Sequence, residues 1–370
     1  MPHFPIVDPI PPPAPIWLLK ALHNLTLALH LTSVELLLGG LLIGLTFAIF
    51  GRLRNSSEMT TASGMLAHRL PTLMAFVINL GVPPLLFAQV LYGRALYTSS
   101  VLIGAFWISV IFLLMGSYYS IYAAAKRVDQ GRSWVAPGLA AIALVLSIAF
   151  IYSNNMTLML RPDEWMSMYR SSPTGVQLNA ADATLMPRWL FFVLGAFPAT
   201  GAVLGLLALR PDTKPAMAKL LSRTGGFAMA LGILFQSLWA FSAIAAQPAG
   251  VVSAMMNNPV YQFSAYAWIV TAALILILGL ILSASAKTNW LIGSACGLVV
   301  FLNVASTVMV RDGIRDRTLI AAGFDVWDRQ VVSNWSVIVL FLILFVGALA
   351  VLGYLAVVIA KARRIEEKYV

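Results

Sequence analysis

Nine apolar segments, each long enough to cross a bilayer, constrain most strongly how this chain can fold. A helix needs about 20 apolar residues to span the hydrocarbon core. Hydrophobic residues make up 60% of the chain and charged residues 10%, whereas soluble domains have roughly 45–50% and 25%. The sequence therefore predicts an all-α polytopic membrane protein. The predicted spans are 17–51, 66–93, 98–125, 134–158, 188–209, 217–246, 261–284, 289–310 and 334–361.

The distribution of basic residues predicts the orientation of these spans. With nine spans, the two ends of the chain lie on opposite sides of the membrane. If the N-terminus is outside, the inner loops and the tail hold 15 of the 24 basic residues. Because Lys and Arg collect on the cytoplasmic side, we expect the N-terminus outside and the C-terminus in the cytoplasm. The net charge of +10 then reflects topology, and nothing favours a nucleic-acid partner.

The predicted spans form one domain between two short ends. A proline-rich extramembrane arm covers 1–16, the nine-helix domain covers 17–364, and a cytoplasmic tail covers 365–370. Two longer connections, 159–187 and 311–333, fall on the outer side and combine mixed charge with tryptophans. They are either a docking face for a partner or polar connectors whose tryptophans sit at the membrane interface.

Ionisable side chains inside the first span need an explanation, because placing them in the hydrocarbon core costs free energy. His23 and His30 are seven residues apart and therefore share a helix face. That face continues into Gly40 and Gly44, a pair of small residues that favours close helix packing. Glu35 lies roughly 140° away from His30, toward a different neighbour. His30 is either an axial haem ligand or a histidine hydrogen-bonded to another helix, and His23 favours the second role.

The second span carries residues that predict a broken helix in mid-membrane. Pro83 and Pro84 each lack an amide donor and follow Asn79 and Gly81, while Gln89 lies further along the same segment. Irregular backbone at this depth is tolerated only where protein or a cavity covers it. The break is therefore either the wall of a binding cavity between the first two spans or a structural kink.

Four short motifs in the first five spans resemble subunit I of the cytochrome bd-type quinol oxidases, which also has nine helices and an outside N-terminus. "LTLALHLT" puts His30 at the position of a haem-ligating histidine, and "GVPPLLFAQVLYG" puts Gln89 at that of a haem-ligating glutamate. "SNNMTLMLRP" is similar to the end of the family's fourth helix. "FVLGAFPATGAV" keeps a Thr-Gly-Ala but puts Phe192 where the family has a second ligating histidine.

The departures from the family pattern argue against oxygen reduction. Gln89 and Phe192 replace two haem ligands, the third span lacks the acids of the family's proton route, and the quinol-binding loop is much shorter. The single cysteine, Cys296, also excludes a covalent c-type haem within this chain. The resemblance thus implies a divergent subunit that does not reduce oxygen.

What the resemblance implies is a multi-pass subunit of a respiratory complex in the bacterial inner membrane, surrounded by lipid. It would hold a b-type haem at His30, a quinone, or both near the outer face, and exchange electrons with a periplasmic c-type cytochrome. Arg161 and Arg188 are suited to pair with haem propionates. A cofactor-free anchor for a redox partner and a secondary transporter are the alternatives. The candidate cofactor-binding residues are His30, His23, Gln89, Asn79, Arg161 and Arg188.

Overall fold

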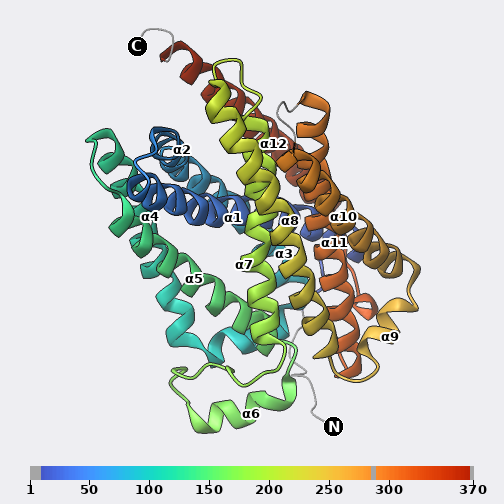
Figure 1. Ribbon diagram of the computed structural model, residues 1–370. Coiled ribbons are helices and arrows are strands. Elements are labelled where there is room, and N and C mark those ends of the chain that lie inside the picture. The colour runs from blue at the N-terminus through green and yellow to red at the C-terminus, as the bar shows by residue number, and fades with distance from the viewer. Residues whose placement is uncertain (1–9, 285–288, 367–370) are drawn as a thin grey trace.

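The computed structural model describes residues 10–284 and 289–366, and all regular structure within them is helical (Figure 1). Nine helical segments of this part are long and apolar enough to cross a membrane, one of them formed by α2 and α3 together. The predicted all-α polytopic membrane fold is therefore confirmed. Parts of the predicted arm, 1–9, and of the predicted tail, 367–370, lie outside the described residues.

The helices follow one another with short connections. In chain order they are α1 (Ile16–Leu53), α2 (Ser57–Ala67), α3 (Leu70–Leu102), α4 (Gly104–Asp129), α5 (Val135–Leu158), α6 (Pro162–Ser171), α7 (Leu185–Leu207), α8 (Pro215–Ala245), α9 (Val251–Met256), α10 (Pro259–Ala284), α11 (Trp290–Ala321), the 3-10 turn η1 (Val326–Asp328) and α12 (Trp335–Glu366).

Helix α1 is the centre of the bundle and packs against α2, α3, α5, α7 and α11. The glycine face predicted in this helix is buried against protein. A Cβ on Gly40 would lie 3.2 Å from Leu70, and a Cβ on Gly44 would lie 3.2 Å from Trp134. The absence of side chains at these two positions therefore lets α1 approach its neighbours closely. Short α6 and α9 lie at the same end of the bundle as the start of α1, hereafter the α6 end (Figure 1).

The two long connections predicted on the outer side differ from the structure, because each contains helical residues. The predicted loop 311–333 begins as helix, because α11 continues to Ala321. The charged residues after position 310, which normally mark the end of a span, remain helical here because Lys20 of α1 and Arg315 of α11 itself both pair with Asp312. The predicted loop 159–187 likewise contains the helix α6.

Helix α3 is not broken where the sequence predicts. Pro83 and Pro84 lie inside a continuous helix, and the residue with non-helical backbone angles is Tyr92 (φ −126°, ψ 25°). Each proline removes only one amide donor from the helix, and the surrounding turns retain helical geometry. The kink therefore lies at the α6 end, where the Tyr92 side chain is fully buried.

The described part of the N-terminal arm is attached to the segment before α12. Val332 donates its amide to Pro12 O at 3.1 Å, and Asn334 donates to Pro13 O at 3.0 Å. Arg329 also donates to Ile10 O at 3.2 Å. These bonds hold the start of α1 and the start of α12 together at the α6 end.

Candidate functional site

A buried ion pair joins α1 to α11 at the α6 end. The Lys20 ammonium lies 2.9 Å from Oδ2 of Asp312 and also donates a hydrogen bond to Oδ2 of Asp316. The two aspartates are one helical turn apart and therefore share a face of α11. Lys20 is 4% exposed, and the aspartates are 1% and 2% exposed. Because burying a charge without a partner is costly, these three groups depend on one another.

Hydroxyl and indole donors complete the coordination of the two aspartates. Tyr92 donates to Asp316 Oδ1 at 2.9 Å, and Tyr261 donates to Asp316 Oδ2 at 2.9 Å. The indole Nε1 of Trp327 donates to the same Oδ2 at 3.0 Å. The network therefore ties α3, α10 and η1 to the ion pair and leaves neither carboxylate uncompensated, as a stable buried network requires.

His23 belongs to this network through both ring nitrogens. Its Nδ1 lies 3.0 Å from Pro84 O, and its Nε2 lies 3.2 Å from the guanidinium of Arg315. Arg315 in turn donates to Asp312 Oδ1 and stacks over Tyr92, with Cζ 4.1 Å from the ring centroid. With both nitrogens engaged, His23 positions Arg315 and has no free atom for a metal.

His30 has the arrangement that a haem ligand needs, since one nitrogen is fixed and the other is free. Its Nδ1 lies 3.1 Å from Val77 O, and the described residues offer no hydrogen-bond partner to Nε2. A backbone carbonyl at Nδ1 is the usual support of a metal-ligating histidine. The ring packs on Gly81, where a Cβ would lie 2.8 Å from His30 Cε1. His30 is thus compatible with the predicted role of a haem ligand. His23 is not compatible with that role.

Glu35 faces away from both histidines, as the helical spacing predicts. It is 5% exposed and lies beside α7 and α8. A Cβ on Gly195 would lie 2.5 Å from Glu35 Oε1 and 2.7 Å from Gln236 Nε2. The glycine therefore creates the space that this acid occupies.

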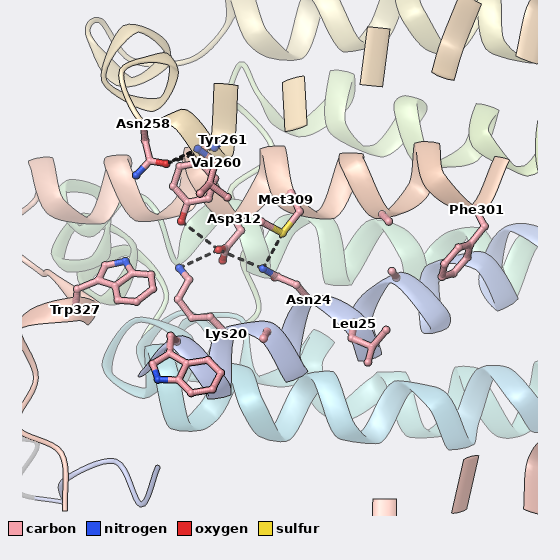
Figure 2. A pocket seen from close by; sticks show the side chains of 14 residues that line it. Lys20, Asn24, Leu25, Asn258, Val260, Tyr261, Phe301, Met309, Asp312 and Trp327 are labelled. Atoms are coloured by element: carbon pink, nitrogen blue, oxygen red, sulfur yellow. Dashed lines mark hydrogen bonds and ion pairs between the residues drawn. The ribbon is translucent and has the colours of Figure 1, made fainter. Parts of the chain in front are cut away.

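A pocket of about 490 Å³ opens beside the ion pair, between α1, α10 and α11 (Figure 2). One end is polar and is formed by Lys20, Asn24, Tyr261 and Asp312. Asn24 donates to Met309 Sδ at 3.3 Å and to Asp312 at 3.4 Å, while its Oδ1 accepts no hydrogen bond. The remaining lining is largely apolar and consists of Trp17, Ala21, Leu25, Ala28, Asn258, Val260, Phe301, Ala305, Met309 and Trp327.

The other predicted site residues do not line this pocket. Asn79 is exposed and donates to a backbone carbonyl one turn earlier. Gln89 is partly buried in α3. Arg161 forms an ion pair with Asp182 at 2.7 Å, and Arg188 donates to a backbone carbonyl of α5 at 3.3 Å. Of the six candidates, the structure brings only His23 into the network beside the pocket.

Apart from His23, the sequence interpretation missed the residues that form the network. The fragment "RDGIRDR" offered a signal, because Asp312, Arg315 and Asp316 recur at the spacing of one helix face. Lys20 offered another, because it is a charge within the first predicted span. Within the part of the chain that the structure describes, no group of three or more His, Cys, Asp or Glu side chains is placed to hold a metal ion.

No protein-family model matches the chain, and no curated protein matches it.

Proposed function

We propose that this chain is a membrane subunit of an electron-transfer complex and that it binds a quinone in the pocket between α1, α10 and α11. The observation that carries the proposal is the division of the pocket into one polar end, at Lys20 and Asp312, and a largely apolar wall. Ligand pockets combine an apolar lining with a few polar groups that fix orientation. A quinone has this division, with ring oxygens at one end and an isoprenoid tail at the other.

The polar end offers partners for both redox forms of such a ligand. The unpartnered Asn24 Oδ1 is an acceptor for a quinol hydroxyl. Lys20 and Tyr261 donate to a quinone oxygen only by exchanging a hydrogen bond to Asp316 for it. Trp17 and Leu25 are exposed side chains of the pocket lining, which gives a lipid-soluble ligand a way in from the bilayer. The apolar lining then accommodates the ring and the tail.

The redox assignment also rests on His30 and on the resemblance to subunit I of cytochrome bd-type oxidases. A b-type haem supplies one-electron chemistry when bound. The Val77 carbonyl holds the imidazole so that Nε2 is directed away from the hydrogen bond and is free for iron. The electron acceptor or donor would be a c-type cytochrome of a partner subunit, since this chain has a single cysteine.

The test is to measure quinone and haem in the full chain purified with its partners. The Ala305→Trp variant fills the pocket, and Ala143→Trp places the same side chain on an exposed face of α5 as the matched control. We expect quinone in extracts of the wild type and of A143W, and a loss of about tenfold or more in A305W. Absence of both quinone and haem from the wild type would refute the proposal and favour the cofactor-free anchor.

A further inference from the structure

Two partly buried arginines, one on α7 and one on α11, lie near the α6 end, where these two helices pack against each other. Arg311 of α11 stacks over Phe192 of α7, with Cζ 4.8 Å from the ring centroid. Arg188 lies one helical turn before Phe192 and therefore on the same face of α7. Arg311 is close enough to Arg188 and Arg315 for their positive charges to repel it. The packing thus concentrates positive charge between these two helices.

The acids near this cluster are already engaged elsewhere. Asp312 accepts from Lys20 and Arg315, and Asp316 accepts from Lys20 and two tyrosines. Asp182 pairs with Arg161 at 2.7 Å. Lys20 and Arg315 therefore balance the two aspartates of α11, and Arg161 balances Asp182.

Arg188 and Arg311 are left with no ion pair among the described residues. Arg188 donates only to a backbone carbonyl, that of Met156 at 3.3 Å. Arg311 has only the ring of Phe192. A partly buried guanidinium without a counter-ion is unfavourable, so a bound anion would compensate both groups at once.

Further donors near these residues in the chain also lack acceptors. Trp189 follows Arg188 directly, and its buried indole Nε1 has no hydrogen-bond partner. Asn154 is fully buried two residues before Met156, and its Nδ2 is unpartnered too. Asn179 Nδ2 is a third such donor, against one unpartnered amide oxygen, that of Asn155. Among the unpartnered amide and indole atoms of these segments, N–H donors therefore outnumber acceptors, and an oxyanion satisfies such donors.

We propose that Arg188 and Arg311 form an anion site for the carboxylate or phosphate group of an amphiphilic ligand. The site lies between α7 and α11, and neither arginine lines the quinone pocket, so the inference does not depend on that pocket. Arg favours such groups because its planar fork makes two parallel charge-assisted hydrogen bonds. Two ligands carry this chemistry at a membrane surface, namely an anionic phospholipid and a haem with its propionates.

The experiment compares the full chain with Arg188→Gln and Arg311→Gln. Arg170→Gln is the matched control, because Arg170 is exposed on α6 at the same end of the bundle. Binding of phosphatidylglycerol, with phosphatidylcholine as the uncharged reference, is measured by native mass spectrometry, and haem is measured by its reduced-minus-oxidised spectrum. For a phospholipid site, we expect each substitution to weaken phosphatidylglycerol binding about tenfold and to leave phosphatidylcholine unchanged. For a haem site, both substitutions reduce haem content and leave phosphatidylglycerol binding unchanged.

Thermal unfolding keeps the test decisive if a variant is unstable. Without the anion, removing an uncompensated charge should leave the unfolding temperature unchanged or raise it. With the anion bound, the same substitution should lower the unfolding temperature relative to R170Q. If R188Q and R311Q match R170Q in lipid binding, haem content and unfolding temperature, the anion site is refuted.

Discussion

The Nζ atom of Lys20 in α1 lies 2.9 Å from Oδ2 of Asp312 in α11, so the first and eighth spans are joined by a buried ion pair. Both side chains are at most 5% exposed. A buried pair contributes less to stability than its distance suggests, because desolvation offsets much of the attraction. Removing one partner of the pair is strongly destabilising, because the other charge is then left without a partner in the protein interior.

Lys20→Met should therefore destabilise the protein strongly. The substitution leaves the carboxylates of Asp312 and Asp316 buried with only Arg315 as a cation in contact. We expect a loss of about 3–5 kcal/mol in the free energy of unfolding, measured by denaturant titration in detergent. Lys219→Met, at an exposed position of α8, is the control and should be close to neutral.

Removing an acid together with Lys20 should recover part of that loss. In the double variant Lys20→Met/Asp316→Asn, one negative charge disappears with the positive one. The double variant should therefore be more stable than the sum of the two single substitutions predicts, because the residues are in contact. Strict additivity in this cycle would show that Lys20 and Asp316 are not coupled.

The two histidines of α1 should respond differently to replacement by alanine. His30→Ala removes the nitrogen that is free for iron, and His23→Ala removes a support of Arg315. We expect the b-type α-band of the reduced protein to vanish in H30A and to persist in H23A. A band that survives in H30A would place the haem elsewhere in the complex.

Gly81→Ala tests whether the close contact between α1 and α3 is required. The added methyl would lie 2.8 Å from Cε1 of His30, so the ring or a helix must move. We expect a destabilisation of about 1–3 kcal/mol, typical of overpacking. Gly347→Ala is the matched control within a span, because no atom lies within 4 Å of its added Cβ, and it should be neutral or slightly stabilising.

The predicted orientation can be tested by cysteine labelling. Cys296 is fully buried, and a Cys296→Ala background leaves no thiol in the chain. In that background, Ser167→Cys on α6 should react with an impermeant maleimide in intact cells, whereas Ser57→Cys at the start of α2 should react only after permeabilisation. The reverse pattern would mean that the α6 end faces the cytoplasm.

The spans were predictable from the sequence because bilayer thickness fixes the length of an apolar helix. The face shared by His23 and His30 was predictable as well, since helical periodicity alone decides it. The structure adds that both rings contact carbonyls of α3, at Pro84 and Val77. These carbonyls are also seven residues apart, so the two helix faces match.

The charge network was not predictable in the same way. A charge at the end of an apolar run usually marks the membrane surface, and on that rule the eighth span ends near residue 310. Asp312 and Asp316 are exceptions to this rule because they form buried ion pairs with Lys20. Lys20 is far away in the chain. One sequence carries the spacing of the aspartates but not the identity of their partner.

The ion pair between α1 and α11 also constrains how the chain is assembled during synthesis. Lys20 leaves the ribosome with the first span, long before Asp312 and Asp316 are made. Until then its ammonium must stay among the lipid headgroups, which a long flexible side chain near a helix end can reach. Helix α1 can therefore move to its final depth only after α11 has been inserted. The network therefore closes once α11 is in place, with α12 still to follow, and a chain truncated before α11 would leave Lys20 without its aspartate partners.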